Sequence, residues 1–191
     1  MPAAPSDAEP RLRARTERYA CSRFALADES WDTRDGVVER PVIHHPGAVA
    51  LIVQPRPGAL VLVRQFRYAI RRWTFEIPAG TRVPGEAAEG TARRELREEA
   101  GLEAERLIEV MRCFPAVGVS SEEMIFYRAE GLRAVAAAPE AGELITIVNA
   151  DAAELLTMVA DGRICDGKTL LALVLIGLTL PQSTSSDPRA A

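Results

Sequence analysis

The sequence predicts an α/β fold, in which a mixed α+β sheet is packed between helices. Short apolar runs separated by glycine, proline and aspartate fill the first half of the chain, and helical patterns begin near residue 88. The 191 residues suffice for one ordinary domain with a sizeable core, and 48% hydrophobic with 26% charged residues is typical of a globular protein. Strands and helices in this order favour a sheet covered by helices.

Five strands are expected before the first helix, each bounded by turn residues. They cover residues 23–28, 36–45, 48–54, 59–66 and 73–77. The first two are expected to pair antiparallel around a turn that contains Asp35 and Gly36. The next two flank the sequence PRPG and are expected to form a buried hairpin, and Pro78 closes the fifth strand.

The second half alternates between helices and strands. A helix is expected over residues 88–100 with Gly101 at its C-terminal cap, because glycine readily takes the left-handed conformation found there. A helix over residues 150–161 ends at Gly162, and Asp166 can cap a last helix that runs to about residue 180. Further strands are expected at residues 106–114, 124–130 and 144–148.

Both ends of the chain have the composition of disordered tails. Residues 1–15 are rich in alanine, proline and charge, and residues 181–191 are polar and bounded by proline. Between them, residues 16–46 are expected to form an antiparallel β extension and residues 47–180 the main domain.

Charge, cysteines and hydropathy argue against several classes of partner. The net charge of −4 and the pI of about 5.4 provide no basic field for nucleic acid or an acidic membrane. Cys21, Cys113 and Cys165 are odd in number and widely spaced, as is typical of reduced thiols in a cytoplasmic protein. The N-terminus lacks an apolar secretory segment. The apolar run at residues 169–180 is too short to span a bilayer and indicates a buried helix.

Three glutamates gather near the C-terminus of the first expected helix. Glu95, Glu98 and Glu99 lie beside the negative end of the helix dipole, and like charges at i and i+4 repel each other. A divalent cation reverses this cost, and carboxylate oxygens suit Mg²⁺, which keeps water and phosphate as its remaining ligands. The alternative is a solvated helix in which the arginines of the segment RRELREEAGL neutralise the acids.

Residues 80–102, GTRVPGEAAEGTARRELREEAGL, resemble the signature of the Nudix hydrolases, G-x5-E-x7-R-E-U-x-E-E-x-G-U with U aliphatic, and fill every fixed position. The resemblance implies a Nudix-like α/β/α sandwich with its catalytic domain over residues 47–180. Glu95 and Glu99 would bind the metal, and Glu98 would bind it or act beside it in catalysis. Structural roles would fall to Gly80, Glu86, Arg94 and Gly101. Arg94 is expected to bridge Glu98 at i+4 or to reach Glu86.

Two segments upstream, VRQFRYA at 63–69 and FEIPAG at 75–80, resemble the ADP-ribose pyrophosphatase group. The resemblance implies that Ala79 supplies its backbone carbonyl to the metal and that Arg67 contacts the pyrophosphate. The alternative for Arg67 is a surface charge at the end of a strand. Glu76 is expected to be either an acid that lines the site or a buried partner for an arginine.

Downstream, FPAVGVSSEE at 114–123 resembles a loop of the same group whose mobile glutamate is proposed to activate water. That position is Glu122, with Glu123 as the adjacent alternative, and Ala116 stands where the group usually has serine. A loop suits such a base, because closure can bring it to the substrate. By the same resemblance, Glu143 would contact the substrate or surround the metal.

The resemblance implies a Mg²⁺-dependent hydrolase, with Mn²⁺ also possible, that cleaves ADP-ribose into AMP and ribose 5-phosphate. The alternatives are another nucleoside diphosphate derivative, such as a sugar nucleotide, NADH or a coenzyme A derivative, or a non-catalytic regulator that binds ADP-ribose. Relatives in this group form homodimers through N-terminal strands, a role that residues 19–45 could play here. No nucleic-acid or membrane partner is expected, and the expected location is cytoplasmic.

Overall fold

The computed structural model describes residues 9–136 and 145–181, and it divides into two compact units. The first unit comprises Met1–Gly47 and Phe114–Glu123, and the second comprises Ala48–Cys113 and Met124–Ala191. The unit boundary at Gly47 adjoins the predicted end of the β extension, but the inclusion of Phe114–Glu123 in the first unit was not predicted.

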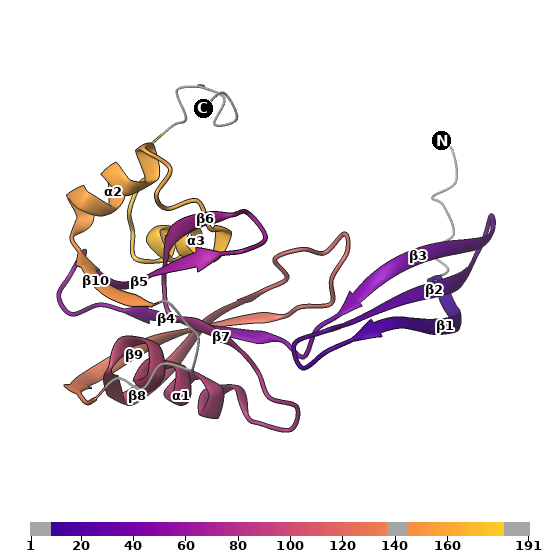
Figure 1. Ribbon diagram of the computed structural model, residues 1–191, viewed down its shortest axis with the longest axis horizontal. Coiled ribbons are helices and arrows are strands. Elements are labelled where there is room, and N and C mark those ends of the chain that lie inside the picture. The colour runs from indigo at the N-terminus through magenta and orange to yellow at the C-terminus, as the bar shows by residue number, and fades with distance from the viewer. Residues whose placement is uncertain (1–8, 137–144, 182–191) are drawn as a thin grey trace, which may run out of the picture. The chain divides into compact units, whose positions relative to one another are not determined.

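The first unit is built on a three-stranded antiparallel sheet in the order β1-β2-β3 (Figure 1). Its strands are β1 (Arg11–Ala20), β2 (Ala25–Thr33) and β3 (Gly36–His44). The two-residue loop between β2 and β3 contains Asp35, and Gly36 follows with a φ of 118°, a value that favours glycine. The predicted antiparallel pair around Asp35 and Gly36 is therefore confirmed.

Strand β1 corrects the predicted tail, because it begins at Arg11 and residues 11–15 were expected to be disordered. All ten of its residues are exposed, and its arginine-rich composition resembles a tail although Leu12 and Ala14 alternate with arginines. Its backbone pairs with β2, and Arg18 Nε lies 2.7 Å from Asp28 Oδ2 across the pair. The parts of the predicted tails at residues 1–8 and 182–191 lie outside the described residues.

The segment Phe114–Glu123 is held to the end of β3 by backbone hydrogen bonds. Ile43 N–H donates to the Val119 carbonyl at 2.8 Å, and Ser121 N–H donates to the Ile43 carbonyl at 2.9 Å. Ser121 Oγ also accepts from His45 N–H at 3.1 Å. These bonds explain why this distant segment belongs to the first unit.

The second unit contains two sheets and, among the described residues, three helices (Figure 1). One sheet has the order β7-β4-β9-β8 and the other β10-β5-β6. The strands are β4 (Ala48–Val53), β5 (Leu60–Arg67), β6 (Arg72–Glu76), β7 (Ala79–Thr81), β8 (Leu102–Cys113), β9 (Met124–Ala134) and β10 (Thr146–Ala150). The helices are α1 (Ala88–Ala100), α2 (Ala152–Ala160) and α3 (Gly167–Leu175).

Strand β4 separates two hydrophobic cores, and all six of its residues are buried. Ala48, Ala50 and Ile52 pack into one core with side chains from α2 and α3. The alternate residues Val49, Leu51 and Val53 pack into another core with side chains from α1. Figure 1 shows α1 on one side of the sheets and α2 with α3 on the other. This arrangement confirms the predicted α/β/α architecture.

The predicted hairpin of β4 with β5 is wrong. β4 pairs antiparallel with β7 and parallel with β9, whereas β5 pairs with β10 and β6 in the other sheet. Both edges of β4 are thereby occupied, and both of its faces are covered. The sequence PRPG therefore connects two sheets and does not form a hairpin turn.

The helix caps agree with the sequence more closely than the strand partners do. α1 has the predicted limits, and Gly101 ends it with a φ of 62° while donating its N–H to the Arg97 carbonyl at 3.1 Å. Asp166 caps α3 as predicted, but this helix ends at Leu175, where residue 180 was expected. Gly177 follows with a φ of 87°, a conformation that ends helices. Among the described residues, none of the helices is both long and apolar enough to cross a bilayer.

Candidate active site at the end of helix α1

The acids of α1 are partly withdrawn from solvent. Glu95 and Glu99 lie one helical turn apart and are only 8% and 4% exposed. Glu98 is less buried, with 24% of its side chain exposed. Burying carboxylates is costly unless opposite charge or hydrogen bonds compensate, so their partners decide what this helix end can do.

Arg94 is the cation that holds these acids together. Its Nη1 lies 2.7 Å from Glu95 Oε1 and 2.9 Å from Glu98 Oε2, and its Nη2 lies 3.9 Å from Glu86 Oε2. Burial alone would lower the pKa of Arg94, but the charges of Glu95, Glu98 and Glu86 raise it above its ordinary value, so the guanidinium stays charged. Both predicted contacts of Arg94 are present.

The other arginines of the helix have different partners. Arg93 pairs with Glu89 at 2.7 Å and donates to the Ala104 carbonyl, and Arg97 contacts Glu103. The alternative interpretation, a solvated helix whose arginines neutralise its acids, therefore holds for the face of α1 that carries Arg93 and Arg97. The face with Glu95 instead belongs to a cluster centred on Arg94.

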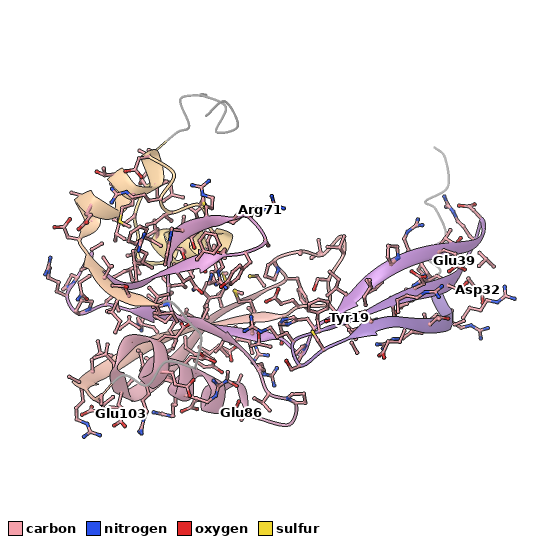
Figure 2. The ribbon with its side chains drawn as sticks, in the orientation of Figure 1. Tyr19, Asp32, Glu39, Arg71, Glu86 and Glu103 are labelled. Atoms are coloured by element: carbon pink, nitrogen blue, oxygen red, sulfur yellow. The ribbon has the colours of Figure 1, made fainter. Side chains whose placement is uncertain are left out.

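The structure explains why the signature has glycine at position 80 and glutamate at position 86. A Cβ at Gly80 would lie 1.9 Å from Glu95 Oε1, so any side chain there would displace this carboxylate. Glu86, labelled beside the start of α1 in Figure 2, accepts a hydrogen bond from Thr91 Oγ1 at 2.7 Å. Glu86 thus ties the loop to the first turns of the helix.

Ala79 and Glu99 meet across the gap between strand and helix. The Ala79 N–H donates to Glu99 Oε2 at 2.9 Å, and Ala79 begins β7, which pairs with β4. Ala79, whose carbonyl is predicted to ligate metal, therefore contacts the predicted acidic ligand Glu99 through its own N–H.

Among the described residues, no three Asp, Glu, His or Cys side chains already surround one point as a preformed metal group. In this structure the carboxylates of Glu95 and Glu98 are both paired with the guanidinium of Arg94. The donor chemistry still fits a hard divalent cation, since it consists of carboxylate oxygens beside the Ala79 peptide. Such an ion would compete with Arg94 for the acids.

Arg67 and the buried Glu76 form an ion pair between neighbouring strands. Arg67 Nε and Nη2 donate to the two oxygens of Glu76 at 2.8 and 2.5 Å, and Glu76 is 1% exposed. Burial alone would raise the pKa of Glu76, but the Arg67 hydrogen bonds and the nearby Lys168 charge outweigh it and lower the pKa to about 2. Of the two predicted roles for Glu76, the structure matches the buried partner of an arginine.

Lys168 is the residue that sequence reasoning missed. Its Nζ contacts Glu76 and lies 3.0 Å from Asp166 Oδ2, with only 9% of its side chain exposed. A compositional signal could have pointed to it, because Lys168 is the single lysine among 23 basic residues. A chain that otherwise uses arginine throughout keeps a lysine at this one position.

The remaining predicted residues are Glu122, Glu123 and Glu143, which follow helix α1 in the sequence. Glu122 belongs to the first unit, is half-buried, and donates its backbone N–H to Ser120 Oγ at 3.1 Å. Glu123 is also half-buried, so both candidates for the loop base stand. Glu143 lies outside the described residues.

Comparison with known proteins identifies the family. Residues 43–164 match the NUDIX domain. The chain belongs to the Nudix family. It is 32% identical over 142 residues to the ADP-ribose pyrophosphatase of Bacillus subtilis, covering 73% of this chain and 77% of that protein. It is 33% identical over 142 residues to the methanol dehydrogenase activator of Bacillus methanolicus, with the same shares of each chain.

A solved structure shares the fold of this Nudix protein. The crystal structure of an ADP compounds hydrolase superposes with a TM-score of 0.73 at 20% identity, over 88% of this chain and 92% of that one. At that identity the likeness concerns the fold alone. It agrees with the α/β/α architecture of the second unit.

Proposed function

We propose that this Nudix protein is a pyrophosphohydrolase that cleaves ADP-ribose into AMP and ribose 5-phosphate. The observation that carries the proposal is the cluster at the end of α1, where Glu95 and Glu98 meet Arg94 and Glu99 meets the Ala79 peptide. This cluster is formed by a complete Nudix signature. The similarity to the Bacillus subtilis ADP-ribose pyrophosphatase supports the choice of substrate.

The residues that would hold a divalent cation are Ala79, through its carbonyl, and the carboxylates of Glu95, Glu98 and Glu99. Mg²⁺ is the proposed ion, with Mn²⁺ as a substitute, because hard oxygen donors suit both. When bound, such an ion polarises phosphoryl oxygens and lowers the pKa of a coordinated water. Arg94 orients Glu95 and Glu98, and it keeps the acids compensated until the ion arrives.

The residues around the substrate have separate proposed tasks. Glu122 would accept the proton of the attacking water, and Glu143 would contact the substrate or surround the metal. Glu76 occupies the Nε and Nη2 edge of Arg67, which fixes the guanidinium plane. The Nη1 side of Arg67 would then meet a pyrophosphate oxygen, and Glu76 would contribute by holding Arg67 in place.

Assembly and location are also part of the proposal. The first unit would mediate a homodimer through residues 16–46. The full exposure of β1 supports this, because an exposed strand can pair with or pack on a partner. A cytoplasmic location fits the free cysteines Cys21, Cys113 and Cys165.

A substrate screen tests the proposed activity. Purified protein is incubated with Mg²⁺ and ADP-ribose, GDP-mannose, NADH or coenzyme A, and the products are separated by chromatography. We expect AMP and ribose 5-phosphate from ADP-ribose, and no product after chelation of the metal. If another nucleoside diphosphate derivative were cleaved faster than ADP-ribose, that compound would be the preferred substrate. Tight ADP-ribose binding without any product would favour the non-catalytic regulator.

A further inference from the structure

The backbone from Ile77 to Ala79 is anchored at three consecutive residues by three different elements. Ile77 N–H donates to Thr169 Oγ1 of α3 at 2.9 Å. The Pro78 carbonyl accepts from Leu51 N–H of β4 at 2.8 Å. Ala79 N–H donates to Glu99 Oε2 of α1 at 2.9 Å. The position of the Ala79 peptide is therefore determined jointly by a strand and two helices.

The anchor in α3 is oriented by the helix cap. Thr169 is fully buried, and its hydroxyl donates to Asp166 Oδ2 at 2.6 Å. A hydroxyl has one hydrogen, so with that hydrogen committed to Asp166 its oxygen is free to accept from Ile77 N–H. Asp166 thus caps α3 and also fixes the direction in which Thr169 faces Ile77.

A second contact from α3 supports the same backbone. Lys168 contacts Glu76, the residue before Ile77, and lies 3.0 Å from Asp166. Two successive residues of α3 therefore hold two successive residues of the chain that leads to Ala79. The compact ammonium group of lysine fits between two carboxylates, where the planar fork of arginine would need more room.

We propose that Thr169, oriented by Asp166, is a positioning residue for the Ala79 carbonyl in metal binding. The inference rests on the proposed function, because it takes Ala79 as a metal ligand. Loss of the Thr169 hydroxyl leaves the Ile77 N–H without its buried acceptor, so the backbone of Ile77–Ala79 gains freedom. A carbonyl that is less well held binds a cation more weakly, because ordering it costs free energy at the moment of binding.

The test measures Mn²⁺ binding without substrate, by calorimetry, for wild type, Thr169→Val and Thr169→Ser. Valine keeps the shape of threonine and removes the hydroxyl, whereas serine keeps the hydroxyl. We expect Thr169→Val to weaken Mn²⁺ binding by ~10-fold, the size of loss found when groups that orient metal ligands are removed. Thr169→Ser should restore binding to near the wild-type value.

The kinetic signature is a rise in the metal concentration that gives half-maximal hydrolysis, with kcat at saturating metal nearly unchanged. Leu173→Ala is the matched control, because Leu173 is fully buried in the same helix and packs in the hydrophobic core. It should lower the thermal stability without weakening Mn²⁺ binding. Asp166→Asn, which disturbs the orientation of the Thr169 hydroxyl, provides a second variant with the same expected direction if Thr169→Val does not fold.

Wild-type Mn²⁺ affinity in Thr169→Val would overturn the positioning role, as would an equal loss of affinity in Leu173→Ala. Because binding is measured without substrate, the result does not depend on which nucleotide is hydrolysed. A protein that hydrolyses no nucleotide, but whose Mn²⁺ affinity follows the Thr169 hydroxyl, would contradict the proposed function and support the positioning role.

Discussion

At the scale of single residues, Arg94 and Gly80 decide how the acids of α1 are arranged. Arg94 compensates Glu95 and Glu98, and the missing side chain of Gly80 leaves room for the Glu95 carboxylate. Without Arg94, the carboxylates at this helix end would repel one another. With Arg94 present, their charge is compensated.

Gly80→Ala should separate folding from activity. The added methyl group would lie 1.9 Å from Glu95 Oε1 and would force this buried carboxylate away from Arg94, so the free energy of unfolding should fall by roughly 1–3 kcal/mol while the fold persists. The displaced ligand should reduce kcat/KM for ADP-ribose by more than ~10-fold. Gly167→Ala, where a Cβ meets open space, is the control and should keep wild-type activity. Equal activity in both variants would contradict the role of Glu95.

Glu99→Gln tests the charge of the acidic cluster. Glutamine can still accept the Ala79 N–H through its amide oxygen, so the fold should persist, but it lacks the charge that attracts a cation. Turnover at saturating ADP-ribose with Mg²⁺ should fall by more than ~100-fold, a larger loss than removal of an orienting group causes. Glu89→Gln alters an exposed acid of the same helix and should have little effect. Turnover that is unchanged in Glu99→Gln would reject the metal assignment.

At the scale of elements, α3 supports the site through its first turn. Lys168 and Thr169, which both contact Asp166, connect this helix to β6 and to the chain that follows it. The ion pairs of Glu76 lie at the centre of this connection, and their contribution to stability depends on pH.

Acid should lower the free energy of unfolding of the wild type, because Glu76 becomes protonated. The pKa of Glu76 falls from 4.5 to about 2 in the folded protein, so its contribution to stability is complete above pH 4.5 and is lost as the pH falls towards 2. Urea unfolding at pH 7, 4.5 and 3 should show a falling midpoint for the wild type. Glu76→Gln should be less stable at pH 7 and lose less below pH 4.5.

Glu109→Gln is the control for this acid effect. The hydrogen bond from Arg112 also lowers the pKa of Glu109, but Glu109 is exposed and solvent screens the pair. This variant should follow the wild type at every pH. If Glu76→Gln and the wild type lost stability equally below pH 4.5, Glu76 would not be the cause of the acid sensitivity.

At the scale of the whole molecule, the proposed base and the proposed metal ligands belong to different units. Glu122 lies in Phe114–Glu123 of the first unit, whereas the acids of α1 lie in the second. The first unit also contains the exposed strand β1, and no residue of β1 belongs to either of the two hydrophobic cores.

The proposed homodimer predicts a mass in solution of twice the 20.7 kDa of one chain. Light scattering coupled to size-exclusion chromatography, at micromolar protein and moderate salt, measures it directly. A mass of 20.7 kDa under these conditions would contradict the dimer. The control is the same measurement at high salt, where an assembly held by apolar contacts should persist.

The sequence by itself determined the limits of α1, its Gly101 cap, the acidic signature and the family, because periodicity, caps and signature spacing are local properties of the chain. The tertiary structure alone decided which strands pair, since β4 and β5 compete for partners across the whole domain and end in different sheets. It also decided the partners of Glu76, because Lys168 lies 92 positions away. The start of strand β1 was not predicted, because residues 11–15 have the charged composition of a tail and their pairing with β2 is a contact of the folded chain. Contacts between distant residues depend on the folded chain, and no local pattern records them.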